Sequence, residues 1–280
     1  MLSLPSVLRV VLASALLSLS ACRSVQLTAP APASASNQPR LPIKDNFYIF
    51  LLIGQSNMAG RGTIEPQDQV PIDRVLTLNA AGEWVPAIDP IHFDKPVAGT
   101  GLGRTFGAEI ARDHPGATIG LVPCAVGGSP IDSWQPGAFY PETKSFPWDD
   151  AMRRARLALQ TGTLKGILWH QGESDSNSAN APAYAGKIAD LVARLRAALN
   201  APDVPFLAGE MGHFPGKPWD IPHEQVDRAT RALVELVPHT AYVSSEGLTD
   251  RGDQLHFNSA SYREFGRRYA DAYRQMSSHK

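Results

Sequence analysis

The sequence predicts an α/β protein in which helices cover a mostly parallel β-sheet. From Phe47 onward, short apolar runs alternate with longer stretches in which apolar residues recur every three or four positions, as they do in amphipathic helices. Several of the short runs are apolar at every position, which is typical of parallel strands buried on both faces. Because the chain also lacks an internal repeat, we expect residues 47–280 to form one layered α/β domain.

The expected strands are the short apolar runs, and the expected helices are the periodic stretches between and after them. The strands cover residues 47–53, 75–78, 118–123, 166–169, 205–209 and 240–244. The helices cover residues 103–113, 148–160, 183–199, 224–237 and 259–276. The third helix has the clearest period, with apolar side chains at Tyr184, Ile188, Leu191, Val192, Leu195 and Leu199.

Two of the connections between these elements are long. Residues 86–101 and 127–147 contain Gly, Pro and aromatic side chains throughout. Long loops of this kind often build binding and catalytic sites, so we expect them to shape the site and its specificity.

The composition describes a globular chain with no excess of either charge. Of 280 residues, 43% are hydrophobic, and 26 Lys and Arg stand against 27 Asp and Glu. Binding to nucleic acid or to an anionic membrane surface would need a local basic patch, so we expect no nucleic-acid partner. The two cysteines, Cys22 and Cys124, cannot supply a disulfide framework or a thiolate metal cluster, and a buried apolar core must therefore stabilise the fold.

The first residues predict export and a lipid anchor. Residues 1–21 carry one charged side chain, Arg9, followed by the apolar run VVLASALLSL, which suits a signal peptide and is too short for a permanent membrane span. The sequence Leu-Ser-Ala-Cys at 19–22 resembles the lipobox of bacterial lipoproteins, in which the cysteine becomes the lipidated first residue. We expect Cys22 to anchor the protein in a bacterial cell envelope, on the periplasmic side or at the cell surface. A plain secretory peptide with an incidental Cys22 is the alternative.

The segment after Cys22 predicts a tether between this anchor and the domain. Residues 22–46 are rich in Pro, Ala and Ser and contain few large apolar side chains. Such a composition buries too little surface to order itself, so we expect a disordered linker.

Four chemically suggestive segments follow expected strands. GQSNMAG at 54–60, CAVGGS at 124–129 and HQGESD at 170–175 each begin where a strand ends, and DQLHFN at 253–258 follows the last strand after a short loop. The carboxyl ends of parallel strands meet at one edge of a sheet, where α/β proteins place their sites. We therefore expect these four segments to converge.

Ser56 is the candidate nucleophile. It lies directly after an apolar strand on a turn flanked by Gly54 and Gly60, where its hydroxyl can project from the sheet edge and its backbone N–H can face the same cavity. A helix N-cap is the alternative, because Ser followed by Asn-Met-Ala is also a good helix start.

Asp253 and His256 are the candidate partners of Ser56. They are three residues apart in a polar segment, so both side chains can lie on one side of a tight turn. The carboxylate would then accept a hydrogen bond from the imidazole, leaving the other ring nitrogen to take the proton of the serine hydroxyl. A polar loop that caps the last helix is the structural alternative.

The candidate oxyanion donors come from three of the segments. Gly127 and Gly128 offer backbone N–H groups with no side chain in the way, Gln171 offers a neutral amide, and the Ser56 N–H would complete the set. We interpret His170 as structural and Glu173 as ordering the Gln171 loop. A metal site built from the histidines and carboxylates of the last two segments is an alternative with little support.

Taken together, the GQSNMAG, GGSPIDSW, HQGESD and DQLHF motifs resemble the sialate O-acetylesterase and acetylxylan esterase group, carbohydrate esterase family six, within the SGNH (GDSL-like) hydrolases. The resemblance implies a flavodoxin-like three-layer αβα sandwich, hydrolysis of acetyl esters on sugars, and no metal or other cofactor. It places the catalytic triad on Ser56, Asp253 and His256 and the oxyanion donors on Ser56, Gly128 and Gln171. Most SGNH enzymes have Asn where this chain has Gln171, a departure that is shared with the carbohydrate esterase branch.

Four further residues are candidates for contact with a substrate. Trp134, in a long loop beyond Gly128, could stack on a sugar ring or lie in the core. Arg61 could contact substrate or steady the loop after Ser56, and Gln55 and Glu173 belong to the motifs themselves.

The resemblance favours a serine esterase that removes acetyl groups through an acyl-enzyme. A lipase-like esterase or thioesterase with longer acyl substrates is one alternative, because the fold supports many chemistries. A surface carbohydrate-binding protein without catalysis is the other.

Overall fold

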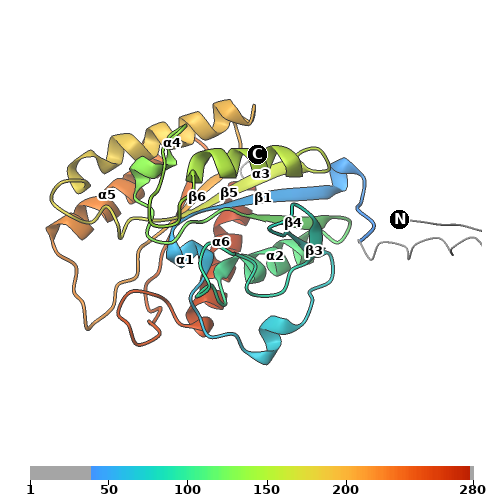
Figure 1. Cartoon of the computed structure of the whole chain (residues 1–280), viewed down its shortest axis with the longest axis horizontal. Helices are drawn as coiled ribbons and strands as arrows, with labels where there is room; N and C mark the ends of the chain where they lie inside the picture. Colours follow the sequence, from blue (N-terminus) through green and yellow to red (C-terminus); the bar gives the residue numbers. More distant parts are fainter. Residues whose placement is uncertain (1–38, 278–280) are drawn as a thin grey trace, which may run out of the picture. The chain divides into compact units, whose positions relative to one another are not determined.

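A seven-stranded sheet forms the middle layer of the computed structural model, which describes residues 39–277 (Figure 1). The strand order is β3-β2-β4-β1-β5-β6-β7, and all neighbours are parallel except β2 and β3. The strands are β1 (Phe47–Gly54), β2 (Val75–Leu78), β3 (Trp84–Pro86), β4 (Thr118–Pro123), β5 (Thr163–His170), β6 (Phe206–Gly209) and β7 (Thr240–Val243). The predicted mostly parallel α/β fold is confirmed.

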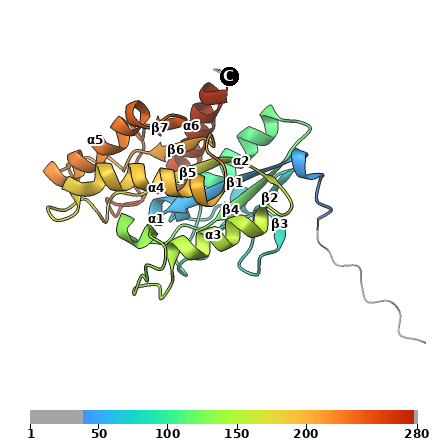
Figure 2. The ribbon, with the colours of Figure 1, turned by 90° about the horizontal axis from the view of Figure 1, so that it is seen from above.

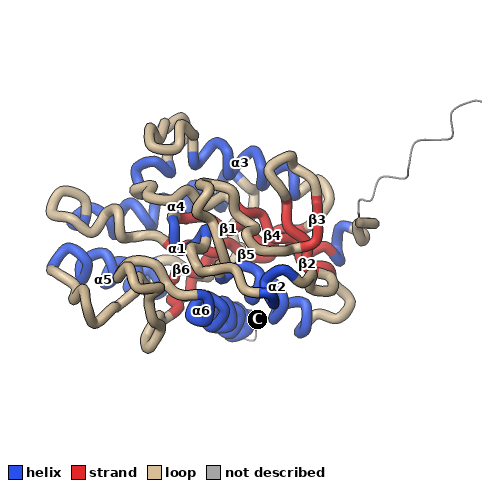
Figure 3. Tube along the Cα trace, turned by 60° about the horizontal axis from the view of Figure 1, so that its bottom comes forward, coloured by secondary structure: helices blue, strands red, loops and turns tan. Residues whose placement is uncertain are grey.

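Helices cover both faces of this sheet (Figures 2 and 3). One face is covered by α3 (Pro147–Ala158), α4 (Tyr184–Ala198) and α5 (Ile221–Leu236), and the other by α2 (Leu102–Asp113) and α6 (Ser259–Ser277). A short helix, α1 (Ser56–Ala59), follows β1 at the carboxyl edge. These layers form the expected αβα sandwich.

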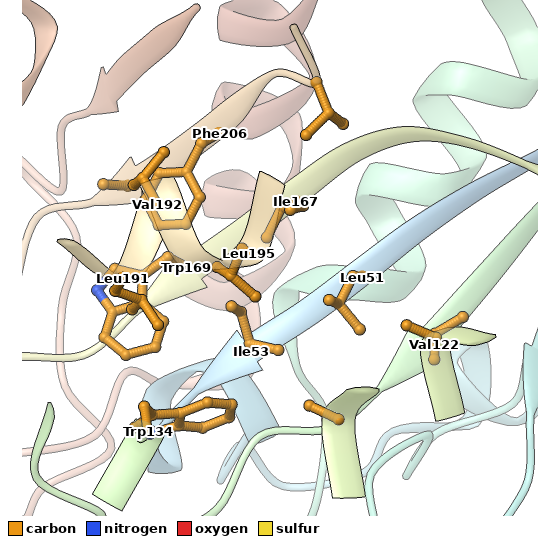
Figure 4. Close-up of a cluster of buried hydrophobic side chains, with 14 of the residues drawn as sticks. Leu51, Ile53, Val122, Trp134, Ile167, Trp169, Leu191, Val192, Leu195 and Phe206 are labelled. Atoms are coloured by element: carbon orange, nitrogen blue, oxygen red, sulfur yellow. The ribbon is translucent and has the colours of Figure 1, made fainter. Parts of the chain in front are cut away.

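Strand β1 shows why the protein has two separate apolar cores. Its side chains alternate between the faces: Leu51 and Ile53 pack with α3, α4 and α5, whereas Phe50 and Leu52 pack with α2 and α6. Figure 4 shows the first of these clusters, in which Trp169 and Phe206 of neighbouring strands meet side chains of α4. Because β1 is buried on both faces, it reads as a continuous apolar run in the sequence.

The expected elements agree with the structure to within a few residues, with two differences. Strand β3 was not predicted, because it is a three-residue edge strand paired only with β2. Helix α5 begins at Ile221 rather than at 224, because the Asp220 carboxylate caps the amide of His223 and Pro222 occupies the first turn.

The expected signal peptide at 1–21, Cys22 and most of the expected tether lie outside the described residues. Of the tether's last residues, Leu41 packs against the core and Lys44–Asn46 forms a 3₁₀ turn ahead of β1. Within residues 39–277, no helix combines the length and apolar character needed to cross a membrane.

The connection between β3 and α2 holds a buried carboxyl group at Asp89. The side chain is 2% exposed, and its Oδ1 has no hydrogen-bond partner in the described chain. Burial raises the pKa of Asp89 to about 7; the Arg104 guanidinium opposes this rise, and Asp68 adds to it. The folded protein therefore binds this proton more tightly than the unfolded chain does.

This proton makes stability depend on pH. A raised pKa contributes stability that is complete below the unfolded value and is lost as the pH rises through the folded value. We expect Asp89→Asn to gain stability relative to wild type, by about 2 to 3 kcal/mol, on going from about pH 5 to about pH 8. Urea unfolding of both proteins at the two pH values measures this difference, and a difference that stays constant with pH would contradict the assignment.

Candidate active site

The three strands that carry the motifs lie side by side at the centre of the sheet. Strand β1 is hydrogen-bonded to β4 on one side and β5 on the other, and Gly54 pairs with His170. The ladder continues beyond the strands: the Val126 amide donates to Gly54 O, and the Gln55 amide donates to His170 O. The segments after these strands therefore start next to one another, as expected for a switch point of a parallel sheet.

Close backbone approach fixes the turn that carries Ser56. Gly54 has φ +128°, and a Cβ there would lie 2.1 Å from His170 O, so only glycine fits. Gln55 occupies the N-cap position of α1 and Ser56 is the first helical residue. The Ser56 hydroxyl does not cap the helix; it lies 3.0 Å from His256 Nε2, although 200 residues separate the two in sequence.

The segment with Asp253 brings its imidazole to this hydroxyl. His256 Nδ1 donates to Asp253 Oδ2 over 2.8 Å, and the amides of Leu255 and His256 donate to Asp253 Oδ1. Burial raises the pKa of the Asp253 carboxyl, but the hydrogen bonds from His256 and Leu255 outweigh it and lower the pKa below its ordinary value. An ionised carboxylate fixes the proton on Nδ1, so the lone pair of Nε2 faces Ser56.

Two backbone N–H groups are free beside this pair. The amides of Ser56 and Gly128 donate to no acceptor within residues 39–277. Gly128 has φ +86°, and a Cβ there would lie 2.8 Å from the Tyr140 hydroxyl, so a larger residue would be strained and crowded. The Asp94 carboxylate accepts from the Gly127 amide, and Ser174 Oγ donates to Gly128 O, which fixes the turn from both sides.

Gln171 differs from its expected role as an oxyanion donor. Its Nε2 donates to Asp175 Oδ2 over 2.5 Å and to Ser129 O over 3.2 Å, and its Oε1 accepts from the Tyr184 hydroxyl. Both amide hydrogens are thus directed at protein acceptors. In this arrangement Gln171 ties the loop after β5 to the glycine turn after β4 and leaves no hydrogen for an oxyanion.

Trp134 is a core residue, which is the second of the two roles that the sequence left open, and it does not stack on a sugar. Its side chain is fully buried, its Nε1 donates to Ser129 Oγ, and its ring lies edge-on to Trp169 at 5.4 Å (Figure 4). The sequence shows Trp134 in a long loop but does not show that the loop forms a 3₁₀ turn, Ile131–Trp134, packed on the sheet.

The other tentative substrate residues divide into two kinds. Arg61 and Gln55 are 4% and 3% exposed: Arg61 pairs with Asp94 at 2.6 Å, and Gln55 Oε1 accepts from the Ser174 amide. These two hold loops together instead of facing solvent. Glu173 is partly exposed and borders a small hollow of about 20 Å³ that Leu255, next to His256, also lines.

Two residues of the site were not identified from the sequence. Asn57 bonds to Glu173 and to the segment around His256, and its place in the first motif was an available signal. Asp94 pairs with Arg61 and accepts from the Gly127 amide. It lies in the long 86–101 loop, whose sequence has no pattern to single it out.

His170 is structural, as interpreted from the sequence. It is fully buried and edge-on to the rings of Phe257 and Phe265, and its Nε2 lies 2.9 Å from Glu210 O. Burial lowers the pKa of His170, so the ring is neutral and Nε2–H donates to that carbonyl. In the described part of the chain, no three His, Cys, Asp or Glu side chains are grouped in a way that could hold a metal ion.

Comparison with known proteins gives consistent matches. The family model described as "Carbohydrate esterase, sialic acid-specific acetylesterase" matches residues 46–275. A probable carbohydrate esterase of Arabidopsis thaliana is 30% identical over an alignment of 264 residues, and the match covers 86% of this chain and 95% of that protein.

Solved structures are similar over most of the chain. A crystal structure of an Arabidopsis thaliana protein has a TM-score of 0.73 at 30% identity and covers 82% of this chain and 98% of its own. NanS has a TM-score of 0.68 at 18% identity (86% and 100% covered), and a carbohydrate acetylesterase from Xanthomonas citri has 0.65 at 21% (83% and 57%). At these identities, the last two show a shared fold.

The burial of Trp134 predicts a large effect on stability. We expect Trp134→Ala to lower the free energy of unfolding by about 3 to 5 kcal/mol, because it leaves a cavity against Trp169 and removes the partner of Ser129 Oγ. Denaturant unfolding measures this loss. A change within about 0.5 kcal/mol, as surface substitutions give, would show that Trp134 is exposed in solution after all.

Proposed function

The chain belongs to the sialic acid-specific acetylesterase family of carbohydrate esterases, so it is a carboxylic ester hydrolase acting on O-acetyl groups of carbohydrates, and we propose that Ser56 performs this hydrolysis through an acyl-enzyme. The observation that supports this mechanism is the chain of hydrogen bonds from Asp253 through His256 to Ser56 Oγ. A hydroxyl alone is a weak nucleophile, and an adjacent oriented base is what activates it.

In the first half of the reaction, His256 Nε2 takes the proton of Ser56 while Oγ attacks the carbonyl carbon of the acetyl group. The carbonyl oxygen becomes an oxyanion, which the amides of Ser56 and Gly128 are placed to stabilise. Collapse of this tetrahedral intermediate breaks the bond to the sugar oxygen, which leaves with the proton held by His256. Proton transfer of this kind contributes roughly 10² to 10⁴ in rate.

In the second half, water replaces the sugar oxygen. His256 accepts a proton from water, whose oxygen attacks the acetyl carbonyl on Ser56, and a second tetrahedral intermediate forms at the same donors. Its collapse returns the proton from His256 to Ser56 Oγ and releases acetate. Asp253 stabilises the imidazolium in both halves without itself being protonated.

Substitutions at the hydrogen-bonded chain test this mechanism. We expect Ser56→Ala to lower kcat for acetate release by about 10⁴-fold or more, and Asp253→Asn by about 10⁴-fold because the imidazole is then held in the wrong tautomer. Acetate release from acetylated xylan, sialic acids and peptidoglycan measures activity and identifies the sugar. Near-normal turnover by Ser56→Ala on its best substrate would rule the mechanism out.

We also propose that the enzyme is lipid-anchored at Cys22 in the cell envelope, on the basis of the lipobox-like Leu-Ser-Ala-Cys at 19–22 and the tether that follows. The domain would then act at a distance from the membrane set by the residues between Cys22 and Leu41, where the chain packs on the core.

Fractionation of cells tests this anchor. We expect the full chain in the membrane fraction and Cys22→Ser in the soluble exported fraction, because the thiol that accepts the lipid is gone. Cys124→Ser is the matched control and should remain in the membrane fraction. Equal partitioning of the wild type and Cys22→Ser would show that Cys22 does not anchor the protein.

A further inference from the structure

The side chain of Asn57 lies between the nucleophile turn and the segment that carries the imidazole. Asn57 is the residue after Ser56 in α1 and is fully buried. Its Nδ2 donates to Leu255 O over 3.0 Å, and its Oδ1 accepts from the Phe257 amide over 3.4 Å. A single amide group thus bonds to the residue before His256 and to the residue after it.

Two further partners fix the orientation of this amide. The carboxylate of Glu173, in the loop after β5, accepts from Nδ2 over 2.6 Å, and the Tyr262 hydroxyl of α6 donates to Oδ1 over 2.6 Å. Both N–H groups therefore meet acceptors and the carbonyl oxygen meets two donors. Flipping the amide would place its oxygen against the carboxylate and Leu255 O, so this one orientation is strongly favoured.

The segment that Asn57 contacts is held together mainly by hydrogen bonds within itself, such as the one from the Arg251 amide to His256 O. Residues 251–256 are in neither helix nor strand, and Asp253 is 39% exposed on the outer side of the imidazole. Besides Asn57, this segment is tied to the loop after Ser56 through Arg251 Nη1, which donates to Arg61 O over 2.5 Å, and to the core through the buried ring of Phe257. Asp253 orients the ring of His256 within the segment but does not fix the distance from the segment to Ser56.

We propose that Asn57 is a positioning residue that sets the distance between Ser56 Oγ and His256 Nε2, by joining the helix that carries the serine to both neighbours of the histidine. The proposal rests on the serine mechanism given above. Because Asn57 and Ser56 are adjacent on one rigid turn, any movement of residues 255–257 relative to Asn57 also moves the imidazole relative to the hydroxyl. A misplacement of about 1 Å can cost roughly 10²-fold in rate.

A double-mutant cycle separates positioning from a general effect on the fold. The cycle measures the effect of Asn57→Ala on kcat twice, once in the wild-type protein and once in the His256→Ala variant. The substrate is p-nitrophenyl acetate, an activated ester on which the low activity of His256→Ala can still be measured. In the wild type we expect kcat to fall about 10²-fold, with KM changed less than about threefold. In His256→Ala we expect the same substitution to change kcat less than about twofold, because there is no imidazole left to position.

Matched variants complete the experiment. Asn79→Ala is the control: Asn79 also donates its amide to a carboxylate, that of Glu83, but at the surface, and the activity of this variant should equal that of the wild type. Tyr262→Phe removes only the hydroxyl that donates to Asn57. This variant replaces Asn57→Ala in the cycle if Asn57→Ala does not fold. We expect it to lower kcat several-fold in the wild type and not in His256→Ala.

The outcomes distinguish this proposal from the proposed mechanism. Equal losses in both backgrounds, or full activity of a folded Asn57→Ala, would overturn the role of Asn57. If Asn57→Ala does not fold, equal kcat values for Tyr262→Phe and the wild type would overturn it. Retention of activity by Ser56→Ala on the same ester would instead overturn the serine mechanism.

Discussion

The site depends on one hydrogen bond, between Ser56 Oγ and His256 Nε2, whose two residues are 200 positions apart. The sheet holds the serine, because Gly54 and Gln55 are still paired with β5 when the chain turns into α1. The histidine is held by side chains, through Asp253 within its own segment and through Asn57 from the serine helix. The serine is therefore placed by the strand ladder, whereas the histidine is placed by these polar contacts and by the buried ring of Phe257 that follows it.

The architecture explains why polar groups accumulate at this edge. Strands β4, β1 and β5 are buried and mostly apolar toward their carboxyl ends, so the loops that follow are the first places where buried backbone and side chains need polar partners. Asn57, Gln171 and Asp175 are buried there: Asn57 bonds to the loop after β5, and Gln171 and Asp175, which lie in that loop, bond to the loop after β4. Such contacts fix relative positions because a buried donor or acceptor left unpaired is costly.

Much of the fold and the grouping of the site residues were predictable from the sequence. The apolar run of β1 predicts a strand buried on both faces, and the period of α4 predicts a helix with one buried face. The motifs at the ends of neighbouring parallel strands must then lie at the same edge of the sheet. Roles that depend on side-chain partners were not predictable. Whether Gln171 donates to an oxyanion or to Asp175, and whether Trp134 faces a sugar or Trp169, depends on loops whose path is set by tertiary packing.

The most direct test of the account is the reaction of the full chain with a serine-directed organophosphorus reagent, followed by peptide mass spectrometry and acetate release. The serine mechanism predicts one modification per chain, on Ser56, and a loss of esterase activity in proportion to it. Esterase activity that persists after Ser56 is fully modified would contradict it, as would inactivation with the label on another residue.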